Sequence, residues 1–453
     1  MSILNPASSK MLVLASSTVG RPRPDMDLVL LSVGLALLIA APVIQDKLQL
    51  GTVVCVGLFP FLLRDAARDL HVRLLITTLI LWVVGQLVAD EVNGLGLRLS
   101  APIILAVTIL ATTTTLVHFA RGDFRSIRFL TVGVTSGLVL SLLVFERAPI
   151  GDPVYWKYGF NVPVSVALLA LTDLAWRRGN RIPSFLALTA ICGIGIWSDS
   201  RGLAGIAALT AVFLLLFRGR RHRHPRTFFA LGATALLLGA LSILFVDSAQ
   251  AGLLGARSAK QVRQFGSDPI SILVNVRPEL YQELGLFLQR PLTGFGSRPQ
   301  LSTSSYMDSL RFVESVGVTD IENVSNYWMH LDIPGVSAHS MAADSWARTG
   351  VLAVPFWILV IVFALWAGTR ALQFRSSPLL IMWTMLVLWD TFFSPLGGSG
   401  ASLLATYLTL AVVTITQRQR NLEKALAIYG PANAKAAVDS PMLGVVSRNG
   451  WSG

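Results

Sequence analysis

The sequence predicts an all-α polytopic membrane protein, and three observations carry that prediction. Hydrophobic residues make up 53% of the 453 residues, charged residues only 14%, and the mean hydropathy is +0.63. These values exclude an ordinary soluble domain. Apolar runs long enough to cross a hydrocarbon layer of about 30 Å recur about twelve times. Lys and Arg are also concentrated in every second loop, as expected between the helices of an inserted bundle.

The predicted spans divide the chain into four parts. Their apolar cores are residues 28–44, 52–63, 74–88, 103–120, 129–145, 162–176, 182–197, 203–217, 228–246, 351–366, 379–393 and 401–415. The second, seventh and eighth runs are short, and runs below about 17 residues are also compatible with re-entrant or interfacial segments. We therefore expect nine spans within 1–246, a large outer loop domain over 247–349, three spans within 350–416, and a small, polar, poorly ordered tail over 417–453.

The sidedness of these spans follows from the loop charges. Short basic loops stay in the cytoplasm because their translocation is disfavoured. Arginines fill the loops around 64–73 and 218–226, for example, whereas the alternate short loops hold only Lys47, Arg98, Arg147, Lys157 and Arg201. Both termini are thus predicted to be cytoplasmic and residues 247–349 to lie outside. Topology and contact with lipid headgroups explain most of the net charge of +12 without any nucleic acid.

The outer segment is too long for an ordinary loop and is rich in aromatic residues, so we expect it to fold. Pro278 suits a first helical position, and apolar residues follow at helical spacing as far as Pro291, which ends the run. A second helix is predicted to begin after His339 and to break near Gly350.

Arginines in this outer region are not explained by topology. Their planar guanidinium groups match phosphate oxygens, although a surface charge or headgroup contact is the ordinary role of any one of them. Arg201 lies in Ser-Asp-Ser-Arg-Gly between two apolar runs, where a guanidinium group close to the membrane needs a hydrogen-bond acceptor. Arg263 and Arg277 are further candidates. Arg290 is equally suited to binding a ligand and to stabilising the C-terminal end of a helix.

Two histidines, His330 and His339, fall in the outer segment. An imidazole can accept the proton of an attacking hydroxyl near neutral pH, although a lone histidine is more often structural. Asp390, near the end of the eleventh span, either pairs with an arginine or caps its helix.

The sequence gives little indication of a metal site or of a disulfide bond. Asp320 and Glu322 form the one close acidic pair in the outer segment, and such pairs are common by chance. Cys55 and Cys192 lie far apart in apolar runs. We predict neither a metal site nor a cofactor.

In their order and spacing, these motifs resemble the O-antigen ligase and polymerase superfamily. The resemblance covers residues 197–355: Ser-Arg-Gly at 200–202, Arg290 followed by Pro-Leu-Thr-Gly-Phe-Gly, and His339 eleven residues before Gly350. Elsewhere only the number and placement of the spans match. The resemblance implies a glycosyltransferase C-like fold in the inner membrane of a Gram-negative bacterium, with the active site on the periplasmic side.

The activity implied by the resemblance is metal-independent, inverting glycan transfer from an undecaprenyl pyrophosphate carrier to a sugar hydroxyl of lipid A-core. His339 matches the family histidine proposed as the base, and Arg201, Arg277 and Arg290 match positions thought to hold the pyrophosphate. The set of candidates is completed by Arg263 for the pyrophosphate and by Asp199, His330, Ser340 and Asp390 as supporting residues. Two departures from the family pattern are Ser340, where asparagine is frequent, and Arg348, where an acidic residue is frequent.

Three alternatives stay open at this point. An O-antigen polymerase would extend a carrier-linked glycan, and a protein O-oligosaccharyltransferase would modify a peptide. A lipid or solute transporter is a different class, but the inverted repeats common in transporters are not evident in the sequence. The expected partners are the carrier-linked donor, the lipid A-core acceptor and membrane lipids.

Overall fold

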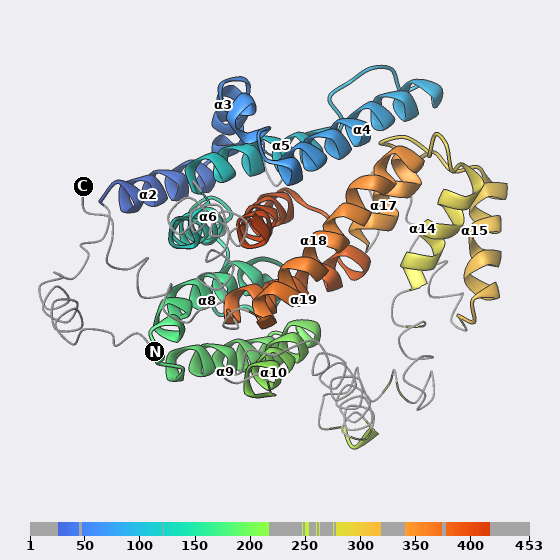
Figure 1. Ribbon diagram of the computed structural model, residues 1–453. Coiled ribbons are helices and arrows are strands. Elements are labelled where there is room, and N and C mark those ends of the chain that lie inside the picture. Colours follow the sequence, from blue (N-terminus) through green and yellow to red (C-terminus); the bar gives the residue numbers. More distant parts are fainter. Residues whose placement is uncertain are drawn as a thin grey trace, which may run out of the picture.

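The computed structural model describes residues 26–44, 48–120, 122–216, 278–318, 340–373 and 377–416, with a few isolated positions between 247 and 275. This part of the chain is mostly helical, and its only sheet is a short two-stranded ribbon. Most helices lie side by side in a bundle, and α14 (Pro278–Gln289) and α15 (Thr303–Ser315) lie at one end of it (Figure 1). The predicted tail, 417–453, lies outside the described residues.

Within these residues, six helical stretches are long and apolar enough to cross a membrane. They are α4 (Leu70–Val92), α5 (Ala101–Ala120), α6 (Phe124–Val144), Pro153–Trp176, Val351–Ala371 and Gly398–Thr416. The fourth comprises α7 (Pro153–Tyr155), η1 (Trp156–Phe160) and α8 (Asn161–Arg177), and the fifth comprises η2 (Val351–Ala353) and α18 (Val354–Gln373). The chain is thus an all-α, membrane-embedded protein.

Shorter helices account for the other predicted runs that the structure describes. They are α2 (Met26–Ala40), α3 (Leu50–Ala66), α9 (Ile182–Trp197), α10 (Arg201–Leu216) and α19 (Pro378–Phe393). The short runs expected at 52–63, 182–197 and 203–217 are therefore helices of 16 or 17 residues. The run at 228–246 lies outside the described residues, so the total of twelve spans stays a prediction.

The first predicted span, 28–44, is wrong at its C-terminal end. α2 stops at Ala40, and β1 (Pro42–Ile44) pairs antiparallel with β2 (Leu48–Gln49). Pro42 lacks a backbone N–H and biases Ala41 away from helical geometry, which accounts for the end of α2 at Ala40.

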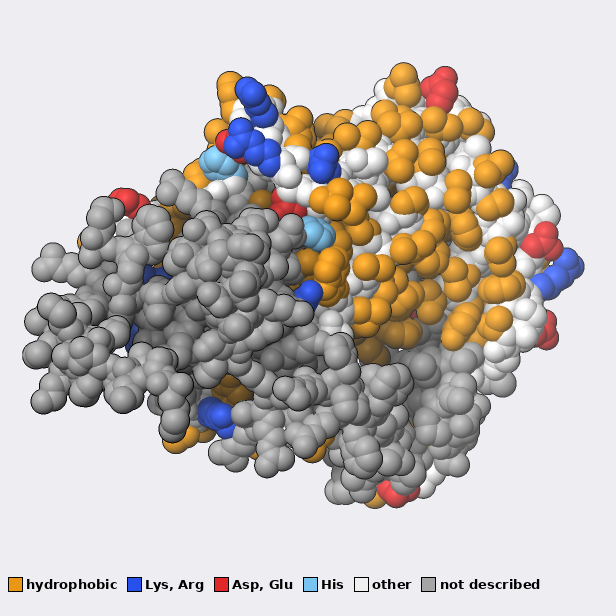
Figure 2. Space-filling view, in the orientation of Figure 1, with side chains coloured by type: hydrophobic (Ala, Val, Ile, Leu, Met, Phe, Trp, Pro, Cys, Tyr) orange, Lys and Arg blue, Asp and Glu red, His pale blue; other side chains and the backbone are white. Residues whose placement is uncertain are grey.

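Apolar side chains on the outside of the bundle follow the helical repeat. On α4, Ile80, Val84 and Val88 are all exposed, and on α18 Ile358 and Val362 are exposed in the same way. Figure 2 shows a broad area of apolar side chains on one face. Exposure of so large an apolar surface to water is unfavourable, whereas contact with lipid chains is favourable.

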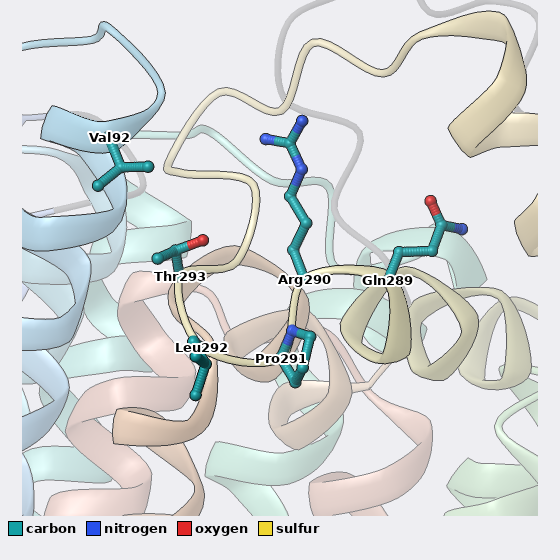
Figure 3. A pocket seen from close by; sticks show the side chains of 6 residues that line it. All are labelled: Val92, Gln289, Arg290, Pro291, Leu292 and Thr293. Atoms are coloured by element: carbon teal, nitrogen blue, oxygen red, sulfur yellow. The ribbon is translucent and has the colours of Figure 1, made fainter.

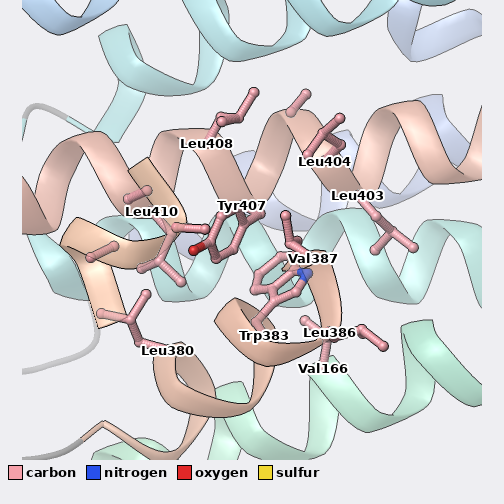
Figure 4. Close-up of a cluster of buried hydrophobic side chains, with 14 of the residues drawn as sticks. Val166, Leu380, Trp383, Leu386, Val387, Leu403, Leu404, Tyr407, Leu408 and Leu410 are labelled. Atoms are coloured by element: carbon pink, nitrogen blue, oxygen red, sulfur yellow. The ribbon is translucent and has the colours of Figure 1, made fainter. Parts of the chain in front are cut away.

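The last described helix, Gly398–Thr416, forms the centre of the bundle, because 83% of its membrane-spanning window is buried. The Tyr407 ring packs against Trp383 of α19, with 5.8 Å between ring centroids, and its hydroxyl lies 2.9 Å from the hydroxyl of Thr384 (Figure 4). Aromatic packing and a satisfied polar pair thus join the central helix to α19.

Two glycines bring α6 and α2 into close contact. A Cβ at Gly133 would lie 2.6 Å from the carbonyl oxygen of Ser32, and one at Gly137 would lie 2.6 Å from that of Ala36. Both pairs are spaced by four residues, which is the small-residue pattern that lets helix backbones approach in membranes.

Helices α14, α15 and α17 (Met341–Thr349) form a small unit that we call the outer domain, after the side predicted from the loop charges. Its core contains Leu286, Phe295, Leu310, Val313 and Ala347. The predicted helix ends near Pro291 and Gly350 are confirmed, since α14 ends at Gln289 and α17 ends at Thr349. Residues 276 and 277 lie outside the described residues, so a helix start at Pro278 stays a prediction. α15 was not predicted.

Candidate functional site

Arg201 lies at the turn between α9 and α10 and is the first residue of α10. The turn is tight: Ser200 N donates to the Gly195 carbonyl oxygen at 2.7 Å, and Asp199 has a left-handed φ of 54°. Gly195 allows this approach, because a Cβ there would lie 3.0 Å from the backbone of Ala204. The geometry fixes Asp199 and Arg201 on the exposed side of the hairpin.

Asp199 bridges two cations. Its Oδ1 accepts Arg201 Nε at 2.9 Å and lies 2.8 Å from Arg201 Nη2, while its Oδ2 accepts Lys157 Nζ at 3.1 Å. Burial raises the pKa of the Asp199 carboxyl, but the hydrogen bond from Lys157 and the charges of Arg201 and Lys157 lower it more, so the pKa lies below its ordinary value. Arg201 Nη1 makes no hydrogen bond within the described part of the chain.

The C-terminal end of α19, which is its predicted outer end, contacts this turn. A Cβ on Gly202 would lie 3.3 Å from the Trp389 indole, so glycine lets that ring pack directly on the start of α10. The neighbouring Asp390 accepts a hydrogen bond from the Ser394 hydroxyl at 2.6 Å. This bond at the end of its own helix is one of the two roles predicted for Asp390. Pairing of Asp390 with an arginine stays a prediction.

Ser340 is the N-cap of α17 and contacts the same end of α19. Its hydroxyl accepts from Ala343 N at 3.1 Å and donates to the Thr391 carbonyl oxygen at 3.2 Å. The residue before it, His339, lies outside the described residues. The last turns of α19 therefore contact both the turn that carries Arg201 and the serine that follows His339.

Several other candidates fall on parts of the chain that the structure does not describe. They are Arg263, Arg277, His330, Asp320 and Glu322. Among the described side chains, no three His, Cys, Asp or Glu residues are grouped as metal ligands.

Arg290 is not brought together with Arg201. It follows the last residue of α14, its Nη1 donates to Asn93 Oδ1 at 2.7 Å, and its guanidinium carbon lies 4.7 Å from the Phe295 ring centroid. Asn93 caps α4, and α4 and α10 lie on opposite sides of the bundle with α18 and α19 between them (Figure 1). Arg290 thus lies on the α4 side of the outer domain.

The loop 291–297 is joined to the C-terminal end of α17 by backbone hydrogen bonds. Phe295 N donates to the Ala347 carbonyl oxygen, and Gly296 N to that of Arg348, both at 2.9 Å. A Cβ at Gly294 would overlap the Arg348 carbonyl, and one at Gly350 would lie 2.5 Å from the Leu292 carbonyl oxygen. The glycines of this motif are therefore required by close backbone contact and by left-handed φ angles of 58° and 79°.

A buried polar network links this loop to α4, and the sequence did not reveal it. Asp90 Oδ1 accepts from Gln86 Nε2 at 3.0 Å and from Ser297 N at 2.6 Å, and Thr349 Oγ1 donates to Gln86 Oε1 at 2.7 Å. An aspartate near the end of an apolar span is the signal that would have identified this residue. The network holds the outer domain against the bundle.

Arg348 and Glu283 lie beside this network. Arg348 donates to Asp344 Oδ1 at 2.6 Å and to the Ser297 carbonyl oxygen at 2.9 Å, so this arginine has a structural role. Glu283 is buried, and neither of its carboxylate oxygens has a hydrogen-bond partner among the described residues. Burial, with the nearby charge of Asp344, raises the pKa of Glu283 well above its ordinary value.

Comparison with known proteins gives no assignment: the chain matches no family model, and no curated protein matches it.

Proposed function

We propose that this protein is an inner-membrane glycosyltransferase of the O-antigen ligase type, with a twelve-span, glycosyltransferase C-like fold. It would transfer a glycan from undecaprenyl pyrophosphate to a sugar hydroxyl of lipid A-core on the periplasmic side. One observation carries the proposal: the outer end of α19 contacts both Gly202, next to Arg201, and Ser340, next to His339. Two motifs that are far apart in the sequence thereby adjoin one helix end.

The setting of Arg201 suits an anionic ligand. A cation at a helix N-terminus is opposed by the helix dipole, whereas an anion there is stabilised. Asp199 holds one edge of the guanidinium and leaves Nη1 unused by described residues. Arg201 and the α10 N-terminus would together hold the pyrophosphate, with Arg263 and Arg277 as its further predicted partners.

The proposed reaction is a direct displacement. The acceptor oxygen forms a bond to the anomeric carbon, the bond from that carbon to the phosphate oxygen breaks, and its electron pair leaves with the pyrophosphate. Arg201 stabilises the growing negative charge. His339 accepts the proton of the acceptor hydroxyl. Attack opposite the leaving group inverts the anomeric carbon.

The test uses purified full-length protein with carrier-linked glycan and lipid A-core. His339→Ala and Arg201→Ala should each reduce transfer by at least about 100-fold, because each removes a group that acts in the transition state. Arg311→Ala is a matched control, because that arginine is exposed and its one described partner is Asp308 on the same helix. Transfer at the wild-type rate in either site variant would remove the proposed site.

The products separate this proposal from its alternatives. A ligase yields glycan-modified lipid A-core and free undecaprenyl pyrophosphate. A ladder of longer carrier-linked glycans without modified lipid A would assign the protein as a polymerase instead. Glycosylation of an added peptide, with lipid A-core untouched, would assign it as a protein O-oligosaccharyltransferase.

A further inference from the structure

Arg290 borders an open pocket that is separate from the Arg201 turn. The pocket has a volume of about 570 Å³ and is lined by Val92, Gln289, Arg290, Pro291, Leu292 and Thr293. In Figure 3 the Arg290 side chain extends between Val92 and Thr293 on one side and Gln289 on the other. The pocket therefore combines a guanidinium group with apolar walls.

The Arg290 guanidinium is held in place before any ligand binds. Asn93 accepts from Nη1, and the Phe295 ring lies beneath the group at 4.7 Å. These contacts reduce the side-chain entropy that binding would otherwise lose. Arg98 adds a second cation nearby, since its Nη2 donates at 3.1 Å to the hydroxyl of Ser297 in the adjacent loop.

The position of the pocket indicates an amphiphilic ligand. Val92 is the last residue of α4, which is long and apolar enough to cross the membrane; if α4 spans it, the pocket is at the level of lipid headgroups. Val92 and Leu292 are 61% and 73% exposed, respectively. Exposed apolar side chains beside a fixed arginine suit a phosphate group that is attached to acyl chains.

The distance from Arg201 indicates which amphiphile this is. α17 lies between the two arginines, with its N-cap Ser340 bonded to Thr391 of α19 and its last residues against loop 291–297. Nine helical residues span about 14 Å. A single pyrophosphate is too short to contact both Arg201 and Arg290 across this separation. An oligosaccharide that connects a lipid phosphate to an acceptor hydroxyl is long enough.

We propose that the Arg290 pocket binds a phosphate group of the acceptor glycolipid, so that the acceptor sugar extends along α17 toward His339. This inference rests on the proposed function. It gives Arg290 the acceptor as its ligand, in place of the pyrophosphate donor that the sequence motif predicts.

The test uses full-length protein in nanodiscs of zwitterionic lipid. The probes are lipid A-core with its phosphates and the same glycolipid after enzymatic dephosphorylation. Arg290→Gln should weaken binding of the phosphorylated probe about tenfold, the effect of losing one charge-assisted hydrogen bond, and should leave binding of the dephosphorylated probe unchanged. In the transfer assay it should raise KM for the acceptor without changing KM for the donor. Arg290→Lys should restore part of the binding.

One variant serves as the control, and three outcomes would contradict the proposal. Arg311→Gln removes an exposed arginine of the outer domain and should change neither constant. Equal weakening for both probes, or a change in donor KM alone, would overturn the proposal. So would loss of the Arg290 dependence in nanodiscs that contain phosphatidylglycerol, since the pocket would then take any anionic lipid. The binding assay does not depend on glycan transfer. Phosphate-dependent binding by a protein that transfers no glycan would therefore contradict the proposed function but support the proposed phosphate site in the pocket.

Discussion

Gly294→Ala should separate loop 291–297 from α17. The residue has a φ of 58°, and an added Cβ would overlap the Arg348 carbonyl group and lie 2.8 Å from Gly350 N. Left-handed geometry costs an alanine about 1 kcal/mol. The overlap displaces the hydrogen bonds from Phe295 N and Gly296 N, each contributing about 1 kcal/mol. The closed loop should thus lose about 3 kcal/mol, and its opening should become about 100-fold more frequent.

Hydrogen–deuterium exchange of the peptide 291–300 measures this opening directly, because the Phe295 and Gly296 amides exchange only when the loop leaves α17. Gly317→Ala is the matched control: its φ is 91°, but no atom lies within 4 Å of the added Cβ. It should leave exchange in 291–300 unchanged. Wild-type exchange in Gly294→Ala would refute the account of this loop.

Three further predictions concern charge and packing. The raised pKa of Glu283 keeps its carboxyl protonated in the folded state above the ordinary value of 4.5, so folded wild type loses stability as pH rises from there toward the raised value. Glu283→Gln should flatten that slope in melting temperatures measured between about pH 4 and pH 8, and parallel slopes would contradict the burial argument. Gly137→Ala should destabilise the α2–α6 contact by about 1 to 3 kcal/mol in unfolding from mixed micelles, whereas Gly193→Ala, with open space around its Cβ, should not. Asp199→Asn should slow transfer through a lower kcat, because it releases the guanidinium of Arg201. In the wild-type protein, the contribution of Asp199 to stability is complete above pH 3.8. It should be lost as the pH falls through the lowered pKa of the folded state. An unchanged kcat would show that Arg201 needs no such support.

Local signals in the sequence predicted much of the fold. Long apolar runs predicted every span that the structure describes, because the bilayer fixes the length of apolar helix that crosses it. Pro291 and Gly350 predicted two helix ends, because proline and glycine each restrict or release the backbone locally. α15 was missed because its composition is polar, although Ser302 as N-cap before apolar residues at helical spacing was a usable signal.

The arrangement of the candidate site depended on contacts that no local pattern encodes. Ser297 and Asp90 are 207 residues apart in the sequence, yet their hydrogen bond fixes where the outer domain lies. The motif grouped Arg290 with Arg201, whereas their separation follows from the packing of Asn93 and α17. Residue type predicts what these arginines can bind, but only packing determines which of them lie close together.

The buried position of Gly398–Thr416 has a consequence for biogenesis. This helix leaves the ribosome after all the other described helices, yet it fills the middle of the assembled protein. Earlier helices must wait in the bilayer around an unfilled centre, which lipids or an insertase have to occupy until this helix has been synthesised. A nascent chain stopped before residue 398 would therefore be a substrate for membrane quality control, even though every span before it had already been inserted.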